Sequence, residues 1–342
     1  MPHQAREPHL LNASVTSAVV ALLLCTQAGA AHLQVPAAAP NTQAAQQQPT
    51  PLESQNSAPI LRVDTRLVNV PVNVVDAHGV AVSGLSQDDF TVREDGRERK
   101  IAIFEREAST PLSIVMAVDT SGSVFSQFKT EREAAKRFAE QILRPEDEMD
   151  LIAFSYQADE IVPYTNDPRR IDDGIKRLTK GDDTALYDAV YVASERLTES
   201  KADATRRRVL VLVTDGGDNT TKREIGYTKA IAEAQRAGAA IYPIIIVPIL
   251  ADAGRNTGGE HALIQMAEDT GGKYFYVTER EDLKSAFAHL SDDLRTQYLL
   301  GYYAPKRGAD NSFRRIDVSL KDPAKAAALS LRSRTGYYAD AR

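Results

Sequence analysis

The sequence predicts an α/β protein in which a doubly wound, mostly parallel sheet is flanked by a β-sandwich. Within residues 108–296, continuous apolar runs such as Ile114–Val118 alternate with amphipathic stretches, a pattern typical of buried parallel strands covered by helices. Residues 60–107 and 297–342 instead show the alternating apolar pattern of antiparallel strands. Each flanking segment is too short to form a stable core alone, so we expect the two to build one sandwich around an inserted central domain.

The first flanking segment carries the clearest strand signal. Val70, Val72 and Val74 are spaced by two residues, as in a half-buried strand. Further along, Glu94-Asp95-Gly96 is typical of a hairpin turn. The second segment has apolar positions that also need a partner, at Tyr298, Leu300 and Val318. Pairing the two segments would bury both sets.

The central region contains two apolar stripes at helical spacing. One stripe comprises Phe128, Ala135, Phe138 and Ile142, and the other comprises Leu186, Ala189, Ala193 and Leu197. A second buried strand is predicted at Val209–Val213. A third apolar run, residues 241–250, contains Pro243 and Pro248. Because proline is unfavourable inside a central strand, we expect this run to contain a strand end or an irregularity.

The first thirty residues are typical of a secretory signal peptide. An apolar stretch from Val15 to Leu24 is followed by Ala28-Gly29-Ala30, which resembles a cleavage site. The alternative is a single membrane anchor, but the apolar stretch is short for a span. Residues 31–59 are rich in Ala, Gln and Pro and predict a disordered linker. We therefore expect a Sec-exported protein that is secreted, periplasmic or bound to the cell envelope, with no membrane span after cleavage.

Composition narrows the class of protein further. The 342 residues carry a formal net charge of −6, which argues against a nucleic-acid binder. The single cysteine, Cys25, lies within the predicted signal peptide, so cleavage after Ala30 would leave a chain without disulfides. A lipoprotein is the alternative, but Leu24 stands where such signals place a small residue.

Oxygen-bearing side chains follow two of the predicted buried strands. The strand that ends at Val118 continues into Asp119-Thr120-Ser121-Gly122-Ser123, and the strand at Val209–Val213 continues into Thr214-Asp215-Gly216-Gly217-Asp218-Asn219. Ligands of open α/β sheets bind outside the carboxyl ends of the strands. Thr184 lies between these motifs in the sequence, at the start of a predicted helix. Its hydroxyl would either cap that helix or point toward the site. Because all these groups offer oxygen, the sequence predicts a hard cation, Mg²⁺, Mn²⁺ or Ca²⁺.

The three motifs, in this order, resemble the metal-ion-dependent adhesion site of von Willebrand factor A domains. The resemblance covers about residues 111–296 and is greatest to secreted proteins of Acidobacteria in which β segments flank the A domain. It implies a Rossmann-like fold and a metal site formed by Asp119, Ser121, Ser123, Thr184 and Asp215. Ser121, Ser123 and Thr184 would bind the cation directly, whereas Asp119 and Asp215 would act largely through water. It also implies a protein partner whose Asp or Glu completes the coordination.

Two charged segments, one acidic and one basic, lie near the predicted helices and strands of the central region. The loop Gly181-Asp182-Asp183-Thr184 has a second acidic residue where many relatives have glycine. These carboxylates are interpreted as a solvated acidic turn, with a second cation site or repulsion of an acidic ligand as alternatives.

The run Arg206-Arg207-Arg208 precedes the second buried strand. It is interpreted as a solvated entry to that strand.

The same residues allow three alternatives to metal-dependent binding. The residues around Asp119 and Ser121 would, in the simplest alternative, only cap the next helix. A metal-stabilised structural envelope protein is a second alternative, and a metal-dependent hydrolase a third. The sequence contains no G-x-S-x-G, H-E-x-x-H or P-loop motif, and His78, His261 and His289 are scattered. We therefore expect a binding module that is not an enzyme.

Overall fold

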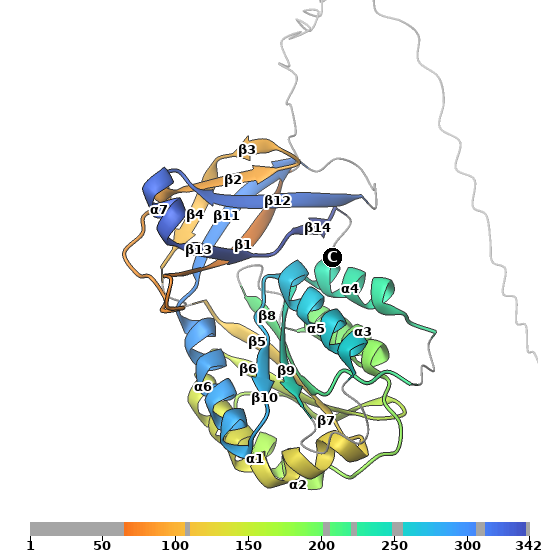
Figure 1. The fold of residues 1–342 in the computed structure, drawn as a ribbon. Coiled ribbons are helices and arrows are strands. Elements are labelled where there is room, and N and C mark those ends of the chain that lie inside the picture. Colours follow the sequence, from red (N-terminus) through yellow and green to blue (C-terminus); the bar gives the residue numbers. More distant parts are fainter. Residues whose placement is uncertain are drawn as a thin grey trace, which may run out of the picture. The chain divides into compact units, whose positions relative to one another are not determined.

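A six-stranded sheet forms the centre of the region between the two flanking segments (Figure 1). Its strand order is β10-β9-β8-β5-β6-β7. The strands are β5 (Leu112–Asp119), β6 (Glu148–Phe154), β7 (Ala158–Thr165), β8 (Arg207–Thr214), β9 (Ala239–Ile246) and β10 (Phe275–Val277). All pairs are parallel except β6 with β7, which confirms the predicted mostly parallel sheet.

The computed structural model describes residues 65–106, 110–200, 206–219, 224–247, 256–305 and 312–339. The predicted signal peptide, residues 1–30, and the predicted linker, residues 31–59, lie outside the described residues. Leu61–Arg342 form one compact unit. Among the described residues, no helix is long and apolar enough to cross a membrane.

Helices cover both faces of the central sheet, as the alternating pattern predicts. They are α1 (Gly122–Ile142), α2 (Pro168–Arg177), α3 (Leu186–Glu199), α4 (Tyr227–Ala237), α5 (Thr257–Thr270) and α6 (Arg280–Arg295). Helices α1, α2 and α6 share one hydrophobic core with the sheet, and α3, α4 and α5 share the other (Figure 1). The predicted stripe of α3 is fully buried, as are Ala135, Phe138 and Ile142 of α1. The side chain of Phe128 lies outside the described set.

The third apolar run contains a strand end, as predicted, because β9 ends at Ile246, although Pro243 itself does not interrupt the strand. This proline lies inside the regular strand β9, paired in register with Leu212 of β8. Strand β10 begins to pair with β9 only at Ile244, so Pro243 has a strand partner on one side. A strand tolerates proline where no ladder hydrogen bond is required on the open side.

The flanking segments form two antiparallel four-stranded sheets, of order β13-β1-β11-β4 and β14-β12-β2-β3. The first segment supplies β1 (Thr65–Val75), β2 (Phe90–Glu94), β3 (Arg97–Arg99) and β4 (Ile101–Glu105), and a short 3-10 helix, Gln87–Asp89, precedes β2. The second supplies β11 (Tyr298–Pro305), β12 (Phe313–Leu320), α7 (Pro323–Ala328), β13 (Ser330–Ser333) and β14 (Gly336–Tyr338). Each sheet therefore mixes strands from both ends of the described chain.

Pairing between the segments buries the apolar positions of both. Val70 of β1 lies opposite Leu300 of β11, and Val92 of β2 lies opposite Val318 of β12. The first three belong to one buried core, with Val318 packed against it. Asp95 and Gly96 join β2 to β3 with positive φ values of 50° and 75°, as a two-residue hairpin turn requires. The predicted fold class, including the antiparallel sheets from both flanks, is thus confirmed.

Arg206-Arg207-Arg208, at the start of β8, are not a solvated strand entry, so that prediction is wrong. Arg207 is buried and donates to the carbonyl of Leu294 at 2.7 Å. The side chain of Arg206 is also buried and donates to the hydroxyl of Ser113 at 2.9 Å. The sandwich residues Arg66, Asn69 and Pro71 lie around the same cavity as these arginines. The tertiary arrangement therefore covers a basic run that looks exposed in the sequence.

Candidate metal centre

Asp119 ends β5 at the carboxyl edge of the central sheet and is completely buried. Its Oδ1 accepts the backbone N–H of Ser121 at 2.8 Å, and its Oδ2 accepts the hydroxyl of Thr214 at 2.7 Å. Burial, together with the nearby charge of Asp215, raises its pKa to about 6, although the hydrogen bonds from the Thr214 hydroxyl and the Ser121 N–H act in the opposite direction. A cation at this edge would favour the ionised carboxylate.

Ser121 precedes α1 at the N-cap position, but its side chain does not cap the helix. Its Oγ is buried, and among the residues that the structure describes it has no hydrogen-bond partner of normal geometry. A buried hydroxyl without a hydrogen-bond partner destabilises the folded state by about 1–3 kcal/mol. A bound ligand, such as a cation, would remove this penalty by contacting the oxygen. The simple helix-cap interpretation of Ser121 therefore fails.

Thr184 is buried in the loop before α3, and the loop after β8 holds it in place. The Thr184 N–H donates to Asn219 Oδ1 at 2.8 Å, and the Asn219 N–H donates to the Thr184 carbonyl at 3.0 Å. The helix itself is capped from the same loop, because Asp218 Oδ1 accepts the N–H of Tyr187 at 3.3 Å. Thr184 is thus not the cap of α3, which was the alternative to a place in the site.

Asp215 follows β8 directly, and its Oδ1 accepts the N–H of Gly217 at 3.0 Å. A Cβ atom on Gly217 would lie 3.1 Å from Asp215 Oδ1 and 3.7 Å from Thr184 Oγ1. The carboxylate and the hydroxyl therefore face the same glycine. The preceding Gly216 has a φ of +85° and packs against the backbone of Gly259 in α5, which leaves no room for a side chain.

The structure brings four of the five predicted site residues to one edge of the sheet. Asp119 and Ser121 come from the end of β5, Asp215 from the end of β8, and Thr184 from the loop before α3. Ser123 lies in the first turn of α1, and its side chain is outside the described set. Three residues that sequence reasoning gave no role hold this arrangement together, namely Thr214, Asp218 and Asn219. All three belong to the polar run after β8, which is the only sequence signal for them.

The donor set fits a hard cation. Hydroxyl and carboxylate oxygens are the atoms available, and a buried Ser121 oxygen lacks a partner. Asp182 is exposed and Asp183 half-buried beside Thr184, as in a solvated acidic turn. His78, His261 and His289 are exposed on three different elements. The oxygens near Asp119 are therefore the ones that would hold Mg²⁺.

Several solved structures resemble this fold at low sequence identity. The conserved hypothetical protein BatB from Bacteroides thetaiotaomicron is 16% identical, with a TM-score of 0.41, over 53% of this chain and 99% of that one. The vWF domain of the type V pili tip protein Mfa5 from Porphyromonas gingivalis is 14% identical, with a TM-score of 0.44, over 54% and 95% of the two chains. The pilus adhesin SpaC from Lactobacillus rhamnosus GG is 11% identical, with a TM-score of 0.46, and the match covers 73% of this chain but 48% of that one.

Comparison by sequence gives the family. No curated protein matches the chain. The family described as von Willebrand factor type A domain matches residues 113–289, which is just over half of the 342 residues. The matched segment runs from β5 into α6 and contains every residue of the candidate centre. The chain therefore belongs to the von Willebrand factor type A domain family.

Proposed function

We propose that this protein is an exported binding module that captures a protein partner through a metal ion. Ser121, Ser123 and Thr184 would hold Mg²⁺, or Mn²⁺ or Ca²⁺ in its place, and Asp119 and Asp215 would act through water. The bound cation would supply the positive charge that attracts an Asp or Glu of the partner. The buried hydroxyl of Ser121, which has no hydrogen-bond partner among the described residues, is the observation that carries this proposal. Family membership supports a protein-interaction module.

The hydrogen bonds of Asp119 support an indirect role for this carboxylate. Both of its oxygens already accept hydrogen bonds, from Ser121 and Thr214. Asp215 likewise accepts the N–H of Gly217. Carboxylates used in this way leave more of a cation's charge available to an incoming acidic group than direct ligands would. The same engagement makes Asp119 a poor general base, which favours binding over hydrolysis.

Export is part of the proposal and rests on the sequence of residues 1–30. The predicted signal peptide would place the mature chain in the periplasm, on the envelope or outside the cell. Fractionation of cells that produce the full chain tests this. Recovery of the uncleaved chain in the cytoplasm would contradict export without bearing on the metal centre.

Partner capture in the presence and absence of the metal tests the binding function. We expect tagged protein to retain a specific envelope protein in Mg²⁺ and to release it in EDTA, and the Asp119→Ala variant to capture none. Converting the carboxylates of the partner to amides should abolish capture as well. Capture that persists in EDTA or in Asp119→Ala would contradict the proposal. If EDTA unfolds the domain without any metal-dependent capture, the structural envelope alternative is correct.

A second test addresses catalysis. We expect no metal-dependent cleavage of generic ester or phosphate substrates, because no nucleophile is paired with a base at the site. The Ser121→Ala variant is the comparison. Turnover that depends on metal and disappears in Ser121→Ala would establish a hydrolase.

A further inference from the structure

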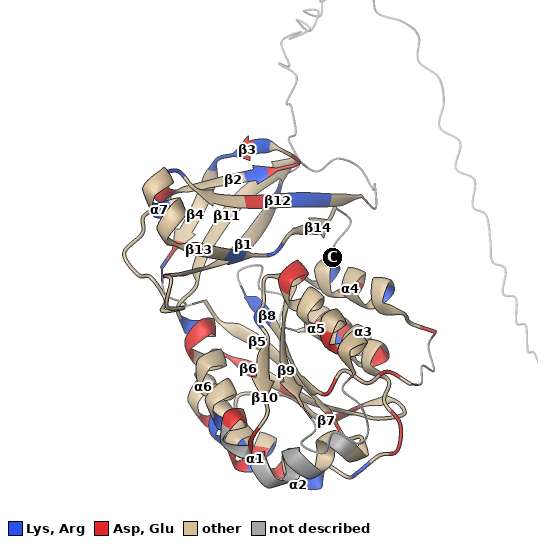
Figure 2. Ribbon diagram, in the orientation of Figure 1, with Lys and Arg blue, Asp and Glu red and all other residues tan. Residues whose placement is uncertain are grey.

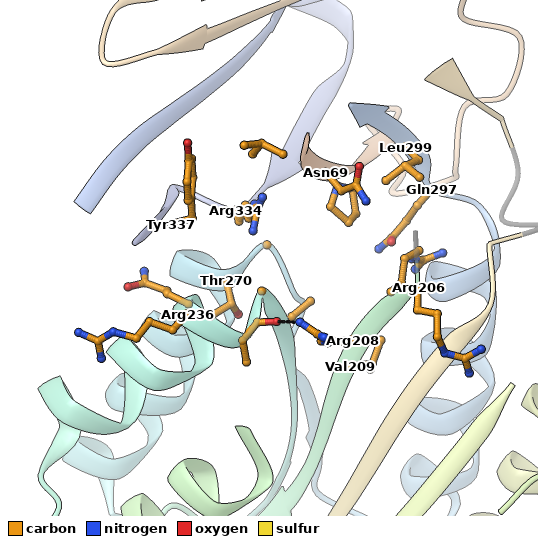
Figure 3. A pocket seen from close by; sticks show the side chains of 18 of the residues that line it. Asn69, Arg206, Arg208, Val209, Arg236, Thr270, Gln297, Leu299, Arg334 and Tyr337 are labelled. Carbon is orange, nitrogen blue, oxygen red and sulfur yellow. Dashed lines mark hydrogen bonds between the residues drawn. The ribbon is translucent and has the colours of Figure 1, made fainter. Parts of the chain in front are cut away.

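A basic cavity of about 120 Å³ lies between the sandwich and the start of β8 (Figure 3). Arg334 and Tyr337 approach it from the sandwich, and Arg208, Arg236 and Thr270 approach it from the central domain (Figure 3). The start of β8 appears as a basic segment in Figure 2. Six arginines line the cavity, and none of the described lining residues is Asp or Glu; the arginines are Arg66, Arg206, Arg207, Arg208, Arg236 and Arg334.

Acidic groups outside the cavity partly balance three of these arginines. Arg206 lies 3.6 Å from Glu148, and Arg236 lies 3.5 Å from Glu233. Arg207 donates to the carbonyl of Leu294, and the nearby charge of Asp293 favours its cationic form. These three arginines therefore have partners within the central domain.

The other three, Arg66, Arg208 and Arg334, form no ion pair among the described residues. Arg208 donates to the carbonyl of Ala237 at 2.8 Å. Arg66 and Arg334 both lie over the ring of Tyr337, with centroid distances of 5.4 and 5.5 Å. The Nε of Arg334 is buried without a hydrogen-bond partner among the described residues. Three cationic groups thus share one small space.

Their charges destabilise one another. Burial lowers the pKa of Arg334 to about 10, and the charge of Arg66 lowers it further. Burial also lowers the pKa of Arg208, and Arg66 again adds to this effect. Arg334 remains cationic at neutral pH, because its pKa of about 10 is still far above 7. The cavity therefore holds uncompensated positive charge.

Helix ends offset only part of that charge. Helices α4 and α5 end at Gly238 and Gly271, and both of these glycines line the cavity. A helix C-terminus carries roughly −0.5 elementary charge, so two of them contribute about −1 against three guanidinium groups. The remainder is about +2, which is the charge that a small dianion would balance.

We propose that this cavity binds one small tetrahedral oxyanion of the phosphate or sulfate type. Arg66 on β1 and Arg334 between β13 and β14 would donate from the sandwich, and Arg208 on β8 would donate from the central domain. Guanidinium groups bind phosphate oxygens through paired N–H donors, whereas a monocarboxylate would balance only one charge. The anion would link the two domains at the end of β8 that lies about 20 Å from Asp215.

Titration of the full chain with inorganic phosphate tests the proposal. We expect saturable one-to-one binding by calorimetry, also seen with sulfate, at constant ionic strength in chloride. Arg208→Gln and Arg66→Gln should weaken phosphate binding by about 10- to 100-fold, as loss of a charged hydrogen-bond donor predicts. Arg97→Gln removes an exposed arginine of the sandwich and should leave the affinity unchanged.

A variant could also bind phosphate poorly because it is misfolded. Thermal unfolding measured without phosphate distinguishes misfolding from loss of the binding site. In chloride alone, Arg208→Gln should unfold at the same temperature as the wild type or higher, because one of three repelling charges is gone. Adding phosphate should then raise the melting temperature of the wild type more than that of the variant. The proposal would be overturned by the absence of saturable binding, by wild-type phosphate affinity in both Arg208→Gln and Arg66→Gln, or by acetate binding as tightly as phosphate.

Discussion

At the scale of single residues, the candidate centre depends on where each oxygen is already engaged. Asp119 accepts two hydrogen bonds within the chain, whereas the Ser121 hydroxyl has no hydrogen-bond partner in the part of the chain that the structure describes. A directly binding oxygen must be available, and an indirectly acting carboxylate must be held in place. In the proposed metal centre these contacts would give different roles to two residues that lie two positions apart in the same motif.

Ser121→Ala and Asp119→Ala should therefore both weaken metal binding. We expect a loss of about 10- to 100-fold in Mn²⁺ or Mg²⁺ affinity for each variant by calorimetric titration. Asp182→Asn removes an exposed carboxylate of the neighbouring loop and should change the affinity little. Wild-type affinity in Asp119→Ala would remove the metal assignment, and a large loss in Asp182→Asn would place that loop in the site.

Asp150 is a second residue whose environment makes a measurable prediction. It is buried on β6, and its Oδ2 accepts the Nη2 of Arg196 at 3.2 Å. The same arginine also binds Glu160 and Glu199, each at 2.7 Å. Burial, and then the charge of Glu160, raise the pKa of Asp150 from 3.8 to about 7. The folded state thus binds a proton that the unfolded state has released between these two pH values.

The stability of the wild type should consequently fall as pH rises from 4.5 to 7.5, relative to Asp150→Asn. A raised carboxyl pKa contributes stability below the unfolded pKa, and this contribution is lost as pH rises to the folded pKa. We expect a difference on the order of 2 kcal/mol between the two pH profiles, measured by urea unfolding. Glu199→Gln, at the exposed end of the cluster, removes only a smaller contribution to the raised pKa of Asp150 and should change the slope less than Asp150→Asn does. Parallel profiles for wild type and Asp150→Asn would contradict the raised pKa.

At the scale of elements, the loop after β8 connects the centre to two helices. Asp218 caps α3, and Asn256 at the start of α5 donates to the carbonyl of Gly216 at 3.0 Å. Gly216 and Gly259 bring the loop and α5 into backbone contact, since a Cβ on Gly259 would lie 1.9 Å from the Gly216 carbonyl oxygen. The position of Asp215 therefore depends on how closely α5 packs.

Two adjacent glycines of α5 give a matched test of this contact. Gly259→Ala should destabilise the protein by about 1–3 kcal/mol, because the new methyl group forces backbone apart, and should weaken metal binding. Gly258→Ala meets only Asn256 Oδ1 at 3.8 Å and should be neutral or slightly stabilising. Thermal unfolding and Mn²⁺ titration measure both effects. Similar behaviour of the two variants would mean that close packing of α5 does not position the loop.

At the scale of the whole molecule, one domain is inserted into another. Strand β1 lies between β11 and β13, so its pairing depends on residues more than 200 positions later in the chain. The central domain reaches the sandwich through side chains as well, as in the ion pair between Arg332 and Asp293 at 2.6 Å.

Deleting residues 297–342 should expose this dependence. We expect rapid proteolysis within residues 65–105 while the central domain survives, because Val70, Val72 and Val74 lose their strand partners. Limited proteolysis with mass spectrometry of the fragments provides the measurement. A first segment that stays protease-resistant and well dispersed by NMR without residues 297–342 would disprove the shared sandwich.

Local sequence pattern was enough for the elements and for most of the centre. Apolar periodicity predicts β5, β8 and the buried stripe of α3, because burial on one or both faces requires that spacing. The motif residues Asp119, Ser121 and Asp215 could be assigned because the carboxyl ends of parallel strands meet at one edge. Each flanking segment is too short to form a stable core alone, and this predicts that the two segments pack together.

What only the tertiary structure decided involves partners that lie far apart in the chain. The placement of Pro243 inside β9 depends on where β10 begins to pair, and the burial of Arg207 depends on a sandwich built from both flanks. The bonds from Thr214 to Asp119 and from Thr184 to Asn219 likewise join separate loops. Each of these features is set by the free energy of a long-range contact, which the spacing of residues along the sequence does not encode.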